Sequence, residues 1–173
     1  MREGLKMRLL RRVDFGLFLA IVLAAIVLAI VRVLGWYSLG FFVGPFRASH
    51  WLSIIGSTYI AIATPAFSIP KRRYLSKYEV LVNFHVIGNL SAVLLVTVHF
   101  ISQLTRSASN YPQLGTGLAL YIVMLLLVGS GFLYRFRVLP RFSVSMNRLV
   151  HVSVAMSFYI LIGIHALHGV GIL

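Results

Sequence analysis

The sequence predicts an all-α integral membrane protein: a single helical bundle over residues 1–173 with five transmembrane helices. Of its 173 residues, 60% are hydrophobic and 11% are charged, and the mean hydropathy is +0.94. Soluble domains carry about 25% charged residues, so we expect a bilayer to surround most of this chain. Five apolar runs each approach the ~20 residues that cross a hydrocarbon layer as a helix. These runs are Phe15–Leu34, Trp51–Ile69, Val80–Leu104, Leu118–Tyr134 and Leu149–Ile172.

The first apolar run, which Arg11 and Arg12 precede, could in principle be a signal peptide. It is long for that role, and no small-residue cleavage site follows it. We therefore expect an uncleaved anchor that is the first of the five membrane spans.

The basic residues predict the orientation of the bundle. Thirteen of the sixteen fall before the first run or in the second and fourth connections, which share one side of the membrane. Only Arg32, Arg47 and Arg106 fall on the other side. The positive-inside rule then puts the N-terminus in the cytoplasm and the C-terminus outside, in a multi-pass protein of the cell membrane. The same rule accounts for the net charge of +13, so nucleic acid is not an expected partner.

The chain contains no cysteine. Its absence excludes covalently attached c-type heme, cysteine-ligated iron–sulfur clusters, thiol catalysis and internal disulfides. Histidine is the obvious ligand that remains for a redox centre.

Four of the six histidines form two pairs with identical spacing. His85 and His99 are 14 residues apart in the third predicted helix, and His151 and His165 are 14 apart in the fifth. Fourteen helical residues rise ~21 Å and turn nearly four full times, so each pair shares one helix face. The two helices run parallel because one helix separates them. We therefore expect His85 and His151 near the cytoplasmic surface, and His99 and His165 near the outer surface.

This constellation favours two noncovalent b-type hemes with bis-histidine ligation. Histidines ~21 Å apart cannot share one ion, and two nitrogens per level are fewer than zinc or copper sites usually take. A proton or ion transporter would need an acidic residue within the spans, and they contain none. A structural alternative is that the histidines only make hydrogen bonds between helices. Ionisable residues inside a membrane are costly and usually functional, which favours the heme interpretation.

Other residues have candidate roles around the hemes. Gly88 and Gly163, with Gly129 and Gly131 in the fourth helix, could give a porphyrin clearance or simply allow close helix packing. Propionate groups could be neutralised by cationic side chains at each level. The candidates are Arg148, Arg141 or Arg72 for the inner heme and Arg106, Arg47 or His50 for the outer heme. His50 and His168 could also be proton carriers at a quinol site or solvated residues at the interface.

The histidine pairs also carry a resemblance to a known family. On its third and fifth predicted helices the chain resembles the ferric-reductase-type transmembrane domain. Ferric reductases, NADPH oxidases and the heme subunit of a bacterial methionine sulfoxide reductase share this domain. The resemblance covers about residues 47–169 and includes Thr116-Gly117 and the ending Ile164–Gly169. The chain departs from the family in having five predicted helices where six are usual, and in having no GxGxxG segment. His85, Gly88 and Ser91 equally resemble the diheme bundle of respiratory cytochrome b.

The expected function is transmembrane electron transfer by a subunit of an oxidoreductase complex. Because no substrate domain is apparent, we expect a redox partner in the form of a flavoprotein, a quinone or other subunits, together with membrane lipid. One alternative is that the protein itself reduces quinone or ferric iron at the outer heme edge, with His50, Arg106, Tyr111 and His168 lining the site. The other is a heme-free structural membrane subunit. No catalytic residue is predicted.

Overall fold

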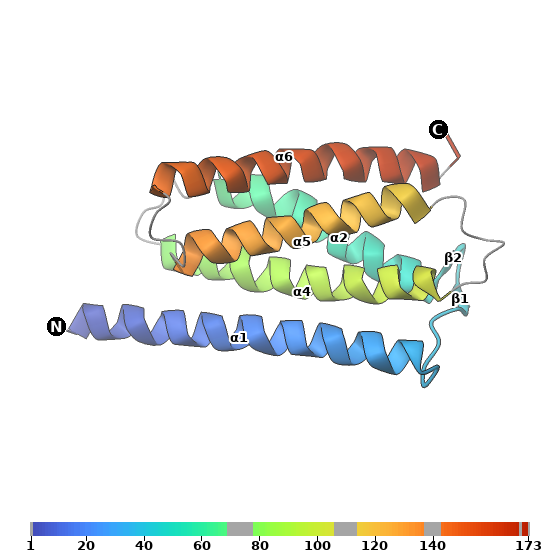
Figure 1. The fold of residues 1–173 in the computed structure, drawn as a ribbon, viewed down its shortest axis with the longest axis horizontal. Helices are drawn as coiled ribbons and strands as arrows, with labels where there is room; N and C mark the ends of the chain where they lie inside the picture. Colours follow the sequence, from blue (N-terminus) through green and yellow to red (C-terminus); the bar gives the residue numbers. More distant parts are fainter. Residues whose placement is uncertain (1, 69–77, 106–113, 137–142, 170, 173) are drawn as a thin grey trace. The chain divides into compact units, whose positions relative to one another are not determined.

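The computed structural model describes residues 2–68, 78–105, 114–136, 143–169 and 171–172, and these are mostly helical (Figure 1). Five helices are present among them: α1 (Arg2–Val33), α2 (Ala48–Ser68), α4 (Tyr78–Leu104), α5 (Leu114–Phe136) and α6 (Val144–Gly169). Each corresponds to one of the five predicted apolar runs.

Four of the described helices are long and apolar enough to cross a membrane. They are α1 over Phe15–Val33, α4 over its whole length, α5 over Gly115–Phe136 and α6 over its whole length. The remaining helix, α2, has 21 residues but does not belong to this group. A fifth membrane span there stays a prediction.

Helix ends differ from the ends of the apolar runs because capping, rather than hydropathy, decides where a helix begins. The run in α6 was predicted from Leu149, whereas the helix begins at Val144. The Ser143 hydroxyl accepts a hydrogen bond from the Met146 amide (3.1 Å), as an N-cap serine does. In α2 the helix continues through Pro65 as far as Ser68, the last residue described there.

The chain forms two compact units, residues 1–105 and 106–173, and each is described by itself. In the first unit α2 packs antiparallel against α4, and α1 also packs against α4 (Figure 1). Gly56 lets the α2 backbone approach α4, since a Cβ there would lie 2.8 Å from the Ala92 carbonyl oxygen. The buried apolar core of this unit comprises Ile60, Val82, Leu90, Ala92, Val93, Val96, Val98 and Ile101.

A short β-hairpin, which the sequence analysis did not predict, connects α1 to α2. Strands β1 (Phe42–Val43) and β2 (Phe46–Arg47) pair antiparallel, with Phe42 opposite Arg47 and Val43 opposite Phe46. Gly44 adopts a φ of 62° in the connecting turn, a conformation that glycine adopts without a steric penalty. Two-residue strands surrounded by apolar sequence give no alternating pattern, which is why hydropathy alone did not reveal them.

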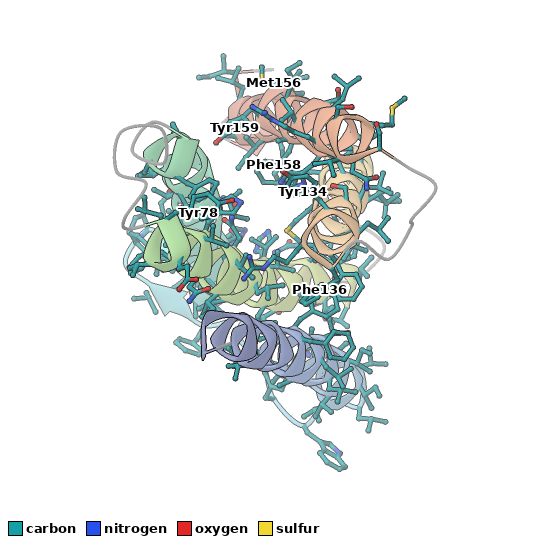
Figure 2. The ribbon with its side chains drawn as sticks, turned by 90° about the vertical axis from the view of Figure 1, so that its left-hand side faces the viewer. Tyr78, Tyr134, Phe136, Met156, Phe158 and Tyr159 are labelled. Atoms are coloured by element: carbon teal, nitrogen blue, oxygen red, sulfur yellow. The ribbon has the colours of Figure 1, made fainter. Side chains whose placement is uncertain are left out.

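The second unit is an antiparallel pair of helices, α5 and α6. Its buried apolar side chains are Leu120 and Met124 on α5 and Phe158 on α6. Figure 2 shows Phe158 and Met156 on opposite sides of α6, and Met156 is 58% exposed. This helix pair positions two of the predicted ligand histidines.

Candidate functional site

His151 and His165 lie on one face of α6, against small residues of α5. A Cβ added to Gly131 would lie 3.2 Å from His151 Cε1, and one added to Gly117 would lie 3.3 Å from His165 Cε1. Both imidazoles are half-buried. The absence of a side chain at these two glycines is therefore what leaves room for the two rings.

Hydroxyl groups beside these glycines contact the ring nitrogens. Ser130 Oγ lies 3.0 Å from His151 Nδ1, and Thr116 Oγ1 lies 3.1 Å from His165 Nδ1. The pairs Thr116-Gly117 and Ser130-Gly131 are 14 residues apart, the spacing of the histidines themselves. Since α5 and α6 are antiparallel, one helix register brings both hydroxyl–glycine pairs opposite both histidines. In each of the two repeats, one histidine of α6 faces one hydroxyl group and one glycine of α5.

The Ser130 contact determines which nitrogen of His151 carries the proton. Ser130 Oγ also lies 2.9 Å from the Leu127 carbonyl oxygen, to which the hydroxyl donates its only hydrogen. Toward His151 the hydroxyl oxygen must then accept, so His151 Nδ1 donates. The neutral ring consequently has its lone pair on Nε2.

In the first unit, His99 has the same arrangement with a main-chain acceptor. Its Nδ1 lies 3.0 Å from the carbonyl oxygen of Ser49, a residue that is 2% exposed at the start of α2. A carbonyl can only accept, so Nδ1 carries the proton here too. Gln103 Nε2, at 3.4 Å from the same nitrogen, is the more distant neighbour. The His50 ring packs beside His99 with a centroid separation of 5.1 Å.

His85 contacts a side-chain amide one helical turn away. Its Nδ1 lies 3.1 Å from Asn89 Nδ2, and its ring stacks on Phe67 of α2 at a centroid distance of 4.7 Å. Asn89 Oδ1 is buried without a hydrogen-bond partner. A half-turn of this amide exchanges its oxygen and nitrogen, so that Oδ1 accepts from a protonated Nδ1. Asn89 and Gln103 are also 14 residues apart and so repeat with His85 and His99.

The predicted glycines have different surroundings. The Tyr59 ring lies directly against Gly88, where a Cβ would meet its hydroxyl, and that hydroxyl donates to the Phe84 carbonyl at 2.9 Å. Gly88 therefore serves the packing of α2 on α4. Among the described atoms, nothing lies within 4 Å of a Cβ added at Gly129 or Gly163. Of the glycines predicted to give clearance, only Gly131 faces a histidine. Gly117, which was not predicted for this role, faces one as well.

The predicted cationic partners are less fully described. Arg148 is exposed on the first turns of α6, in a surface depression that Tyr134, Ser145 and Leu149 also line. Arg47 lies over the Phe42 ring, with 5.5 Å between its guanidinium carbon and the ring centroid. Arg72, Arg106, Tyr111 and Arg141 lie outside the described residues.

Across the described residues, no group of three or more His, Cys, Asp or Glu side chains is placed to hold a metal ion. Two axial ligands suffice for heme iron. The partners of the histidines, which were not predicted, are Ser130, Thr116, Ser49 and Asn89. The signal that could have revealed two of them is the repeated hydroxyl–glycine dipeptide at 14-residue spacing.

No protein-family model, curated protein or solved structure matches this chain.

Proposed function

We propose that the protein is a diheme b-type transmembrane electron-transfer subunit of an oxidoreductase complex. The observation that carries the proposal is that each of the four paired histidines has a polar partner at Nδ1, at 3.0–3.1 Å and from its own unit. Histidines that ligate metals almost always donate the second ring N–H to such a partner, which fixes the tautomer and orients the ring. The arrangement suits axial ligation through Nε2.

On this proposal His85 and His151 hold one heme, and His99 and His165 hold the other. The 14-residue spacing in both helices puts the two levels ~21 Å apart along the helix axis. Gly117 and Gly131 are small where a bulkier side chain would displace a ligand ring. These residues bind and orient, while the heme when bound supplies the one-electron chemistry.

The proposal extends to membrane, orientation and partners. Four long apolar helices support a multi-pass protein of the cell membrane, with a fifth span in α2 and a cytoplasmic N-terminus. Arg148 at the inner level, and Arg106 and His50 at the outer level, are the candidates for contact with propionates. Electrons would come from or pass to a flavoprotein, a quinone or other subunits. We also propose that the chain belongs to either the ferric-reductase-like or the cytochrome b-like group.

A heme-free structural subunit is the second candidate, and a specific observation favours it. Every paired histidine already has a hydrogen-bonding neighbour within its unit, which satisfies a buried imidazole without any cofactor. The two candidates differ in what the purified protein binds. Reduction of quinone or ferric iron at the outer heme edge is a further activity that the diheme protein would permit.

The deciding experiment is the heme content per polypeptide, measured as pyridine hemochrome on the purified full chain. Two noncovalent b hemes are expected in the wild type. His99→Ala should lose the outer heme and His151→Ala the inner one, each leaving about half of the heme. His168→Ala is the matched control, because it removes a half-buried α6 histidine from outside the pairs. A colourless protein that keeps its helical circular dichroism would support the structural subunit instead.

A further inference from the structure

The segment between α1 and α2 carries several exposed aromatic side chains. We define the aromatic foot as residues 36–47, which include the hairpin β1–β2. Its exposed side chains are Trp36 (75%), Phe42 (68%), Phe41 (59%), Val43 (47%) and Phe46 (41%). Exposed apolar side chains gathered on one short segment mark a candidate site of interaction with protein, ligand or membrane.

Hydrogen bonds hold the start of the foot back against the last turns of α1. The chain leaves α1 through Gly35, with a φ of 77°, and the Trp36 amide donates to the Val31 carbonyl oxygen at 3.1 Å. The Tyr37 hydroxyl then reaches back to donate to the Leu28 carbonyl oxygen at 3.3 Å. Leu28 belongs to the apolar span Phe15–Val33. The foot therefore begins alongside the end of a candidate membrane span.

Tyr37 is partly buried against the end of α1. Its pKa is raised because burial disfavours the phenolate, although the nearby Arg32 guanidinium acts in the opposite direction. Arg32 Nη1 also donates to the Tyr37 carbonyl oxygen at 3.2 Å. An arginine at the end of a span, with its charge carried toward the surface, is typical of the membrane interface.

The far end of the foot is fixed to α2. Trp51 Nε1 donates to the Val43 carbonyl oxygen at 2.7 Å, and the Ala48 amide donates to the Phe41 carbonyl oxygen at 3.0 Å. Phe46 packs edge-on against Trp51 with centroids 5.6 Å apart. These contacts fix the hairpin to α2 and leave its aromatic side chains exposed. Its one cation, Arg47, lies over the Phe42 ring.

We propose that the aromatic foot lies in the headgroup–acyl boundary of the bilayer and binds phospholipid there. Lipid is the occupant that the observations favour, because the foot follows directly in the chain on the exposed end of α1, where Val33 is 69% and Leu34 is 58% exposed. Tryptophan prefers this boundary, where its apolar ring is buried and its N–H stays near water, and the exposed phenylalanine rings of the foot gain by leaving water. The Ser49 amide donates to the Leu39 carbonyl oxygen of the foot, and the Ser49 carbonyl oxygen accepts a hydrogen bond from His99. The depth of the foot in the bilayer therefore also fixes the depth of His99.

The absence of native cysteine allows a clean spin-label test of full-length protein in vesicles of phosphatidylcholine and phosphatidylglycerol. Phe42→Cys carries the nitroxide, Val27→Cys on the exposed face of α1 is the lipid control, and free label in buffer is the aqueous reference. At position 42, collisions with oxygen should exceed those with a water-soluble nickel complex several-fold, though by less than at position 27. Collisions with nickel as frequent as for the free label would overturn the proposal. Protection from both reagents would also overturn it, since protein would then cover the foot.

Tryptophan fluorescence gives an independent measurement on unlabelled protein, because Trp36 and Trp51, the only two tryptophans, lie in or beside the foot. Lipids brominated near the headgroup end of the acyl chain should quench this emission more than lipids brominated near its centre. The quenching should fall in Trp36→Phe, which leaves only the less exposed Trp51. Emission that brominated lipids leave unchanged would contradict the proposal. Neither experiment depends on heme, so its outcome is separate from that of the proposed function.

Discussion

Ser130 Oγ lies 3.0 Å from His151 Nδ1 and donates its own hydrogen to the Leu127 carbonyl oxygen. A serine on α5 thereby sets the tautomer of a histidine on α6. The contact recurs 14 residues away, between Thr116 and His165. On the proposed function both histidines are heme ligands, and these hydroxyl groups orient them.

Ser130→Ala should weaken the inner heme while leaving the helices intact. Without an acceptor for its Nδ1 proton, His151 becomes a less basic and less well oriented ligand. We expect heme affinity at that site to fall by about tenfold or more. The midpoint potential should rise, because a less basic ligand stabilises ferric iron less. Optical redox titration measures both sites, and Ser130→Thr should restore the wild-type value.

The matched control for this substitution is Ser157→Ala, which removes an exposed hydroxyl of α6 that only bonds the Ser153 carbonyl oxygen. It should leave both potentials unchanged. If Ser130→Ala and Ser157→Ala behave alike, Ser130 has no role toward a ligand.

Thr116→Val should affect only the outer heme. Valine keeps the shape of threonine but removes the hydroxyl that His165 Nδ1 contacts at 3.1 Å. Because Thr116 and Ser130 are 14 residues or ~21 Å apart on α5, their effects should be additive in the double variant. Strong coupling between them, measured by the same titration, would argue against two separate sites.

Gly131→Ala should disturb His151, whereas Gly129→Ala should not. A Cβ at 131 would lie 3.2 Å from His151 Cε1, so the ring must give by a few tenths of an ångström, but a Cβ at 129 meets nothing within 4 Å. Heme absorption and electron paramagnetic resonance spectra should change only in Gly131→Ala. Gly129→Ala should also stabilise the helix by up to ~1 kcal/mol. Identical spectra for both variants would show that Gly131 does not provide clearance.

Gly56→Ala should destabilise the packing of α2 on α4. Its Cβ would lie 2.8 Å from the Ala92 carbonyl oxygen, and a backbone atom cannot rotate away. We expect a loss of about 1–3 kcal/mol, the usual cost of overpacking. Thermal unfolding in detergent measures it, with Gly163→Ala, where nothing lies within 4 Å, as the control. Equal stability of the two variants would mean that α2 and α4 move apart to accommodate the added methyl group at little cost in free energy.

His50→Ala should retain both hemes. The His50 ring stands beside His99 at 5.1 Å, but the spacing of the pairs leaves it outside the ligand set. Pyridine hemochrome should give the wild-type heme content, in contrast to His99→Ala. Loss of one heme in His50→Ala would make His50 a ligand and require a different pairing.

The sequence by itself determined the helical, apolar character of the chain and the histidine repeat. Both are local properties, since hydropathy accumulates along one segment and a 14-residue spacing defines one face of one helix. The boundaries of α1 and α6 were less well predicted, because helices continue past the apolar residues until a cap such as Ser143 intervenes.

The tertiary structure alone decided what stands opposite each histidine. Thr116 and Ser130 face His165 and His151 because of the register between antiparallel helices, which no property of a single helix specifies. In the same way, Tyr59 lies against Gly88, and Ser49 reaches His99 across 50 residues of sequence. Side-chain volumes fitting between neighbouring helices fix these relationships, so they emerge only when the helices are packed.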